Sequence, residues 1–289
     1  MIFIGRGDQI INERAVRFTK AAVNRSIAYR VVCQVFGSKG GDQVERILPF
    51  TNEHKMFQDA FSKFVASEMA PYYDEWEENC VVSRDIFTKM GDNGYLCPWV
   101  EEKYGGSSAD FLFSVIETEE IARQGVRAVF TWLHSDIVAP YIDTYGTDEQ
   151  KARFLPGVTS GEKILAVAMT EPGAGSDLAA MRTRAVKDGN EYVINGSKTF
   201  ISNGILADLV VLAVKTDPGA GAKGITLFLV ENGTPGFSKG RQIPKVGLHA
   251  QDTVEMFFED CRVPAENMLG GEGNGFKCLM SKLQQERLM

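Results

Sequence analysis

The stretch from Ile164 to Asp177 constrains the fold of this chain more than any other part of the sequence. It begins with an apolar run, Ile164-Leu165-Ala166-Val167, which predicts a buried strand. Pro172 ends the strand, because proline has no N–H for a β ladder. The segment Thr170-Glu171-Pro172-Gly173-Ala174-Gly175-Ser176-Asp177 predicts a glycine-rich turn whose exposed N–H groups can cradle an anion such as a pyrophosphate. The plain alternative is a turn without a ligand.

Length and composition exclude several classes of protein. A chain of 289 residues is long enough for about two domains. No stretch approaches the roughly 20 apolar residues of a membrane span, and a net charge of −7 without a basic, aromatic-rich cluster argues against nucleic acid. The 5 cysteines include no CxxC pair and the 3 histidines lie far apart, which indicates a reducing compartment and no metal site.

Residues 1–45 differ from the rest, because the stretch from Arg14 to Gly41 is basic and contains no acidic residue. Such a segment is typical of a mitochondrial transit peptide. The alternative is an upstream start in a bacterial reading frame. We therefore expect a leader or a disordered extension over 1–45.

From about residue 51 the apolar spacing predicts helices. The first carries a stripe that Pro71 should end, the second is capped by Ser83, and the third covers about 110–124. Thr147 and Gln150 fit a capping box for a fourth helix, which should end near Pro156. The stripe of the first helix consists of Phe57, Phe61, Phe64, Val65 and Met69.

After residue 160 the pattern changes to strands. Runs at 191–195 and 197–202 flank Asn195-Gly196, which favours a hairpin turn. Further strands are expected at 209–214, 225–230 and 254–258, and helical spacing returns at Gly275. Helices followed by strands indicate an α+β chain of two domains, and the strand spacing suits a small barrel or sandwich.

The segment Lys198-Thr199-Phe200-Ile201-Ser202-Asn203-Gly204 adds a second motif. Together with T-E-P-G-A-G-S-D it resembles the acyl-CoA dehydrogenase flavoproteins, over about residues 46–289. The resemblance implies an N-terminal helical domain at 46–163, a middle β-barrel at 164–272 that binds flavin, and the start of a truncated C-terminal helical bundle at 273–289.

The resemblance also implies FAD along both motifs. Strand alternation puts Phe200 and Ser202 on one face, where in this family an aromatic ring lies against the isoalloxazine and a hydroxyl donates to flavin N5. Many members have Trp at the position of Phe200, and the alternative is an ordinary core aromatic. The residues expected to contact the cofactor are Val167, Ala168, Met169, Thr170, Gly173, Ala174, Gly175, Ser176, Phe200, Ile201 and Ser202.

Glu286 is the candidate catalytic base. It lies on the apolar face that Leu279 and Leu283 define, where a carboxylate is costly unless it is paired or protonated. The alternative is a solvated residue on a frayed helix. Glu286-Arg287-Leu288 is similar to the long-chain and isovaleryl-type members, which place the base here. Gln284 in place of a proline, and Lys277 in place of an aromatic, leave the chain-length preference open.

For the whole protein, the resemblance implies FAD-dependent dehydrogenation of a medium- or long-chain acyl-CoA to trans-2-enoyl-CoA in β-oxidation. Electron transfer flavoprotein would reoxidise the cofactor, in a homotetramer of the mitochondrial matrix or bacterial cytoplasm. Alternatives are a branched-chain (isovaleryl-type) enzyme, an acyl-CoA oxidase or a truncated, non-catalytic fragment. The expected substrate contacts are Ser176, Ala222, Lys223, Gln284, Gln285 and Arg287.

The activity of these 289 residues by themselves is a separate question. A helix over 275–289 is marginal in length without a partner for its apolar stripe. We therefore expect weak FAD retention, a solvated Glu286 and no turnover from this chain alone.

Overall fold

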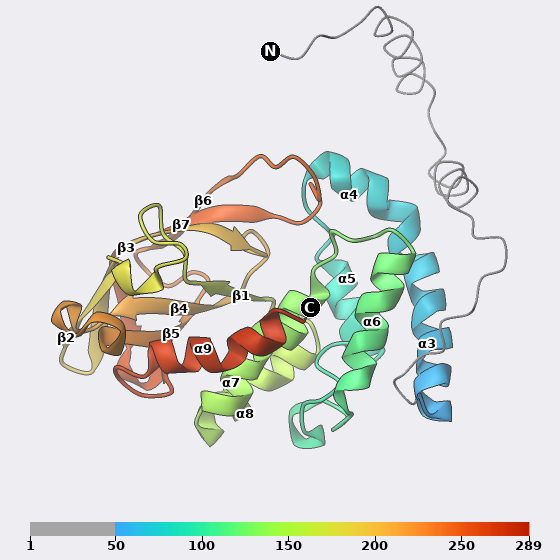
Figure 1. The fold of residues 1–289 in the computed structure, drawn as a ribbon, viewed down its shortest axis with the longest axis horizontal. Helices are drawn as coiled ribbons and strands as arrows, with labels where there is room; N and C mark the ends of the chain where they lie inside the picture. The colour runs from blue at the N-terminus through green and yellow to red at the C-terminus, as the bar shows by residue number, and fades with distance from the viewer. Residues whose placement is uncertain (1–49, 289) are drawn as a thin grey trace, which may run out of the picture. The chain divides into compact units, whose positions relative to one another are not determined.

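The computed structural model describes residues 50–288, so the leader expected at 1–45 lies outside the described residues. Helices come first along the described chain (Figure 1). No helix within 50–288 has the length and apolar character to cross a membrane. The α-helices are α3 (Asn52–Phe64), α4 (Tyr73–Asn79), α5 (Asp85–Asp92), α6 (Phe111–Arg123), α7 (Ala139–Tyr145) and α8 (Asp148–Thr159), and π-helical turns occur at η1 (Val65–Met69) and η4 (Leu133–Val138).

The first helix, α3 with its π-helical turn η1, ends at Met69, just before Pro71 as predicted. The chain passes from η1 through a short 3₁₀ turn, Ala70–Tyr72, straight into α4. Pro71 occupies the first turn of that 3₁₀ segment, where a missing N–H costs no hydrogen bond. The predicted apolar stripe is confirmed, since Phe61, Val65 and Met69 are fully buried.

The other helix predictions are mostly confirmed. Asp110 caps α6, and Thr147 with Gln150 forms the expected capping box of α8. Ser83 accepts a hydrogen bond from Asp85 N at 3.3 Å, although Arg84 is the N-cap residue of α5. The predicted end of α8 near Pro156 is wrong, because the helix continues to Thr159. The buried residues Phe154, Leu155 and Val158 anchor the last turn, which outweighs the hydrogen bond lost at the proline.

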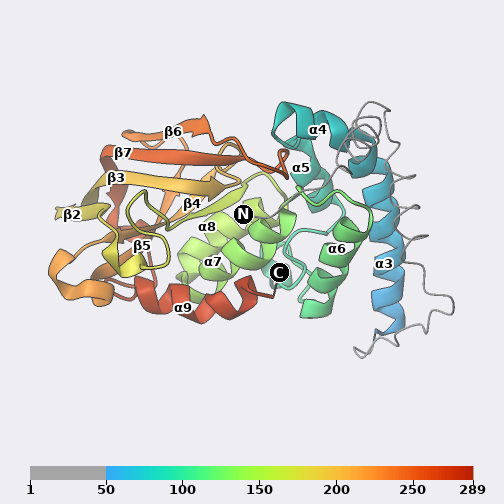
Figure 2. The same ribbon diagram turned by 45° about the horizontal axis from the view of Figure 1, so that its top comes forward.

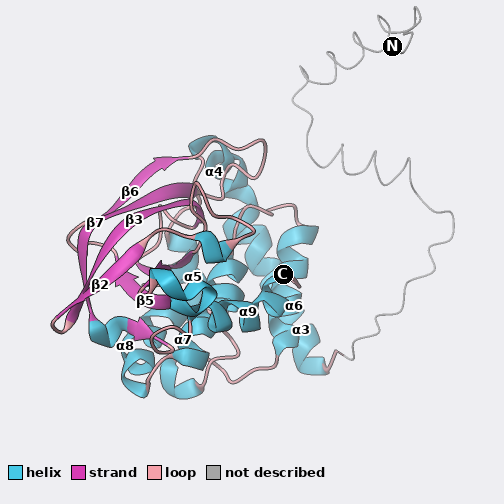
Figure 3. Ribbon diagram, turned by 60° about the vertical axis from the view of Figure 1, so that its left-hand side comes forward, coloured by secondary structure: helices cyan, strands magenta, loops and turns pink. Residues whose placement is uncertain are grey.

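The predicted β-barrel is wrong, because the eight strands within residues 50–288 form one open sheet in the order β6-β7-β3-β2-β4-β5-β8, with β1 beside β4. Closure would require the end strands β6 and β8 to pair. β8 has only two residues and pairs with β5 alone. Figure 3 shows the strands gathered on one side, with most helices on the other. The strands are β1 (Leu165–Ala168), β2 (Arg184–Asp188), β3 (Glu191–Ser202), β4 (Leu209–Lys215), β5 (Ile225–Glu231), β6 (Phe237–Gln242), β7 (Thr253–Pro264) and β8 (Met268–Leu269).

The predicted hairpin at Asn195-Gly196 is also wrong. Both residues lie inside the continuous strand β3, at a shift in its pairing with β7. A Cβ on Gly196 would lie 2.7 Å from the Cα of Thr183, so glycine is needed here for close approach between strands. The true hairpin joins β2 to β3 around Gly189, whose φ is +62°.

The last helix, α9 (Gly275–Glu286), packs against the rest of the fold. Figures 1 and 2 show it alongside α7, which it also contacts together with η4 and β5. Cys278 and Leu279 are 3% and 1% exposed and belong to the apolar core that the helices share with β4 and β5. The expectation that this helix has no partner for its apolar stripe is therefore wrong.

Candidate functional site

The structure brings the two sequence motifs side by side. β1 ends at Ala168, and the following turn is closed by reciprocal bonds between Glu171 and Ala174, from Glu171 N to Ala174 O (2.9 Å) and back (3.1 Å). Thr199 N donates to Thr170 O at 2.9 Å. The glycine-rich turn and the end of β3 therefore form one continuous wall.

Phe200 is the most unusual residue of this wall. Its φ is +59°, a conformation that is strained for an aromatic residue, and its pairing with β7 is interrupted between Lys198 and Ile201. Phe200 is 64% exposed, so the core-aromatic alternative is wrong. Ile201, which lies between Phe200 and Ser202, is buried, whereas Ser202 is half-buried. Phe200 and Ser202 therefore lie on the more open side of the strand.

The glycines of the turn leave open space in front of the backbone. Gly173 and Gly175 have negative φ, and a Cβ added to either would meet no atom within 4 Å. Packing among the described residues therefore does not require glycine here. Ser176 is exposed, Ala174 is buried, and Val167 and Ala168 lie in β1 behind the turn. An open glycine backbone is suited to a phosphate-bearing ligand that approaches main-chain N–H groups.

The expected substrate contacts fall into three groups. Ser176 precedes the 3₁₀ turn η5 (Leu178–Ala180), Ala222 and Lys223 lie in the 3₁₀ segment η6 (Pro218–Gly224), and Gln284, Gln285 and Arg287 lie at the end of α9. η5 contacts η6, so the first two groups lie close together; α9 also contacts η6, but near its start, where Gly273 approaches the carbonyl of Lys223, whereas the third group lies at the other end of the helix.

Glu286 is half-buried at the end of α9, and not solvated as the sequence alone allowed. Burial raises the pKa of its carboxyl, and the charge of Arg287 opposes this only in part. The hydroxyl of Tyr141 is fully buried, has no hydrogen-bond partner among the described residues, and is close enough for the charge of Glu286 to raise its pKa. The neighbouring Gln285 donates from Nε2 to the carbonyl of Asp136 at 2.7 Å, which fixes the helix end on η4.

No hydrogen bond among the described residues joins Glu286 directly to Phe200 or Ser202. The wall formed by the two motifs and α9 are connected instead through the segment that leads into η4. Asn203, next to Ser202, donates to Phe130 O at 3.4 Å, and Gln285 bonds to Asp136 further along the same segment. The sequence analysis missed this bridging segment, which begins with the paired rings of Phe130 and Trp132, 4.5 Å apart.

A pair of buried carboxyls was also missed. Asp136 of η4 accepts hydrogen bonds from Ser114 Oγ (2.7 Å) and Trp99 Nε1 (3.2 Å), and burial raises its pKa to about 6 despite these bonds. Burial and the charge of Asp136 raise the pKa of Glu117 well above its usual value. The available signal was the spacing of Ser114 and Glu117, which puts two polar residues on the inner face of the 110–124 helix.

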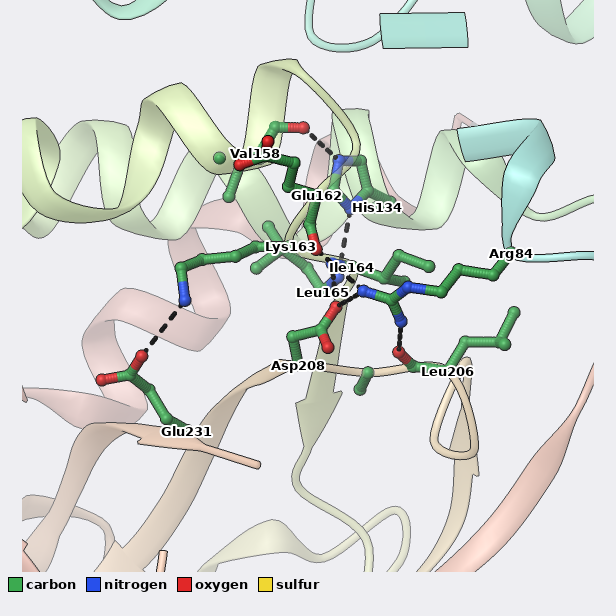
Figure 4. A network of polar contacts seen from close by, with 12 residues as sticks. Arg84, His134, Val158, Glu162, Lys163, Ile164, Leu165, Leu206, Asp208 and Glu231 are labelled. Atoms are coloured by element: carbon green, nitrogen blue, oxygen red, sulfur yellow. Dashed lines mark hydrogen bonds and ion pairs between the residues drawn. The ribbon is translucent and has the colours of Figure 1, made fainter. Parts of the chain in front are cut away.

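The helical part holds β1 through a polar network (Figure 4). Leu165 N donates to His134 Nδ1 at 3.1 Å, so the other ring nitrogen carries the proton and donates to Val158 O at 3.0 Å. Burial lowers the pKa of His134 to about 4, which keeps the ring neutral. Ile164 N donates to Asp208, which also pairs with Arg84. The strand that leads into the glycine-rich turn is thus fixed at its start.

Comparison with known proteins identifies this arrangement. Residues 51–162 match the acyl-CoA dehydrogenase N-terminal domain, and residues 166–261 match the acyl-CoA dehydrogenase middle domain. The chain belongs to the acyl-CoA dehydrogenase family. This is a family of FAD-dependent oxidoreductases, and the open glycine turn and exposed Phe200 fit such a cofactor.

Individual relatives agree with this assignment. The mitochondrial long-chain specific acyl-CoA dehydrogenase of Rattus norvegicus is 48% identical over 83% of this chain, which spans 56% of the rat protein. The crystal structure of an acyl-CoA dehydrogenase from Geobacillus kaustophilus is 57% identical, with a TM-score of 0.81 over 83% of this chain and 63% of that one. A glutaryl-CoA dehydrogenase from Mycobacterium smegmatis in complex with FADH2 is 29% identical, with a TM-score of 0.74 over 82% of this chain and 60% of that one.

Proposed function

We propose that this chain forms the cofactor side and part of the substrate side of an enzyme that dehydrogenates an acyl-CoA thioester to trans-2-enoyl-CoA. The observation that carries the proposal is Phe200, an exposed aromatic in a strained backbone that Thr170 O holds beside the open glycine turn. Strain of this kind persists only where the surrounding structure imposes it, and it clusters at active sites and ligand contacts. We propose that the wall of Thr170, Phe200 and Ser202 faces the isoalloxazine, and that Gly173, Gly175 and Ser176 follow the phosphates.

The residues of the chain divide the chemistry between them. When bound, FAD supplies the acceptor for the hydride that leaves the β-carbon. Ser202 offers a hydroxyl donor toward that acceptor. Glu286 takes the α-proton on its carboxylate. Burial raises the pKa of this carboxyl, and a general base works best when its pKa lies close to the working pH.

The finer substrate assignment rests on local sequence. Glu286-Arg287-Leu288 and the identity to the rat long-chain enzyme support a medium- or long-chain acyl group, with a branched, isovaleryl-type acyl group as the alternative. We also propose electron transfer flavoprotein as the electron acceptor, a homo-oligomer in the whole protein, and a mitochondrial or bacterial cytoplasmic setting. The division at residues 46–163, 164–272 and 273–289 is part of the same proposal.

Anaerobic titration tests the proposal. The purified chain is first titrated with FAD and then with butyryl-, octanoyl-, palmitoyl- and isovaleryl-CoA while the flavin spectrum is recorded. FAD binding that weakens in Phe200→Ala supports the assigned wall, and the acyl-CoA that perturbs or bleaches the flavin identifies the acyl preference. FAD binding that is unchanged in Phe200→Ala refutes the wall, and rapid reoxidation by oxygen favours an oxidase.

A further inference from the structure

Lys198 is a fully buried lysine directly behind the cofactor-side wall. Its Nζ donates to the carbonyl of Met169 at 3.0 Å and to Oε1 of Glu171 at 2.8 Å. Both acceptors belong to the segment that opens the glycine-rich turn, whereas Lys198 belongs to β3. A single ammonium group therefore ties the two motifs together from the inner side.

Glu171 extends this connection to a third segment. Its carboxylate accepts hydrogen bonds from Arg182 N (2.6 Å) and Thr183 N (3.0 Å), at the start of β2. Burial by itself would raise the pKa of Glu171, but the charge of Lys198 and these bonds outweigh it and lower the pKa. A buried ion pair adds little net stability compared with apolar side chains packed in its place. A contribution to folding stability alone therefore does not explain the presence of the Lys198–Glu171 pair.

The geometry of the peptide bond shows what the pair controls. The described chain has no cis peptide bond, so the Met169 carbonyl and the Thr170 N–H point in opposite directions. Because Lys198 holds the carbonyl inward, the Thr170 N–H points away from the buried pair. No hydrogen bond joins that N–H to another described residue. The Thr170 carbonyl, in turn, accepts from Thr199 N, the residue before the strained Phe200.

We propose that Lys198 and Glu171 are positioning residues that orient the Thr170 N–H towards a cofactor acceptor and hold Phe200 in its strained conformation. The inference rests on the proposed function for the identity of the cofactor. Neither side chain touches the cofactor, because both are buried behind the wall. The pair acts through the backbone of Met169, Thr170 and Thr199.

The test separates positioning from stability with three variants and a control. Lys198→Met and Glu171→Gln each remove one charge, and the double variant removes both, so that no unpaired charge stays buried. Lys239→Met is the matched control, because Lys239 Nζ also donates to backbone carbonyls of the same domain, Ile205 O (2.9 Å) and Ala207 O (2.6 Å). Urea unfolding, hydrogen exchange at Thr199, FAD affinity and the visible circular dichroism of bound flavin are measured for each.

We expect Lys198→Met to lose stability and the double variant to regain most of it. FAD affinity should stay about tenfold weaker in both, because one oriented donor is worth about one hydrogen bond. Exchange at the Thr199 amide should accelerate, and the circular dichroism of the bound flavin should change. In Lys239→Met the FAD affinity and the flavin spectrum should match those of the wild type.

A double variant with wild-type FAD affinity, flavin spectrum and Thr199 exchange would overturn the inference. If FAD is not bound even by a version extended by the C-terminal domain, the cofactor assignment of the proposed function fails. The exchange measurement then decides by itself whether the pair holds the wall, since Thr199 protection that survives in Lys198→Met refutes it.

Discussion

The docking of α9 can be tested by truncating Leu279, and the outcome decides whether Glu286 has a fixed position. Leu279 is 1% exposed, whereas the adjacent Met280 is 37% exposed. Leu279→Ala therefore removes buried apolar contacts, and Met280→Ala on the same helix serves as the matched control. Both substitutions favour the helix by intrinsic propensity, so a difference between them reports packing.

The expected cost follows from burial. Leu→Ala substitutions in full cores cost about 3–5 kcal/mol. Because α9 is buried on one side only, we expect Leu279→Ala to cost about 2–3 kcal/mol in the free energy of docking α9. This corresponds to a factor of about 30–150 in the docking equilibrium constant. A helix of 12 residues is marginal by itself, so this loss should undock α9 before the remaining fold unfolds.

Hydrogen exchange resolved along the chain provides the assay. In Leu279→Ala, amides from Cys278 to Leu283 should exchange about 30–150 times faster, while amides of β4 should change little. The pKa of the Glu286 carboxyl should fall towards its usual value, because undocking removes the burial that raises it. Equal exchange in Leu279→Ala and Met280→Ala would refute the docked helix and restore the expectation of a frayed chain end.

Four further predictions concern the wall, the base and His134. In the enzyme extended by its C-terminal domain, Ser202→Ala should slow flavin reduction by acyl-CoA about tenfold to a hundredfold, and an unchanged rapid-mixing rate would contradict its role as a donor. In a version of the chain extended by its C-terminal domain, Glu286→Gln should lower turnover at least about 10²–10⁴-fold while acyl-CoA still perturbs the flavin spectrum; normal turnover would place the base elsewhere. Phe200→Gly should weaken FAD binding in fluorescence titrations, with little loss of stability in urea, because it relieves a left-handed conformation that costs about 1–2 kcal/mol. His134→Asn keeps one acceptor and one donor but cannot titrate. Since the folded-state pKa of His134 is about 4 against 6.5 unfolded, its contribution is complete above pH 6.5 and is lost as the pH falls towards 4. Urea midpoints of wild type and variant should therefore converge over that window, and a constant difference would contradict a buried neutral ring.

The sequence by itself determined the features that depend on neighbouring residues. The capping box of Thr147 and Gln150, the helix at Phe111–Arg123 and the strands Leu209–Lys215 and Ile225–Glu231 follow from local spacing and were predicted. The two motifs also pointed to the family, because their order and spacing are specific. Each of these signals comes from residues that are close together in the chain, so the amino-acid sequence by itself is enough to predict them.

Only the tertiary structure decided the features that depend on contacts between distant segments. The sheet stays open because β6 and β8 do not pair, and Asn195-Gly196 lies within a strand because Thr183 approaches it. Lys198 reads as an ordinary strand residue until Met169 and Glu171 surround its ammonium group. In each case the conformation or environment of a residue is set by contacts with a segment far away in the chain. The local spacing of apolar residues does not show which distant segment that is.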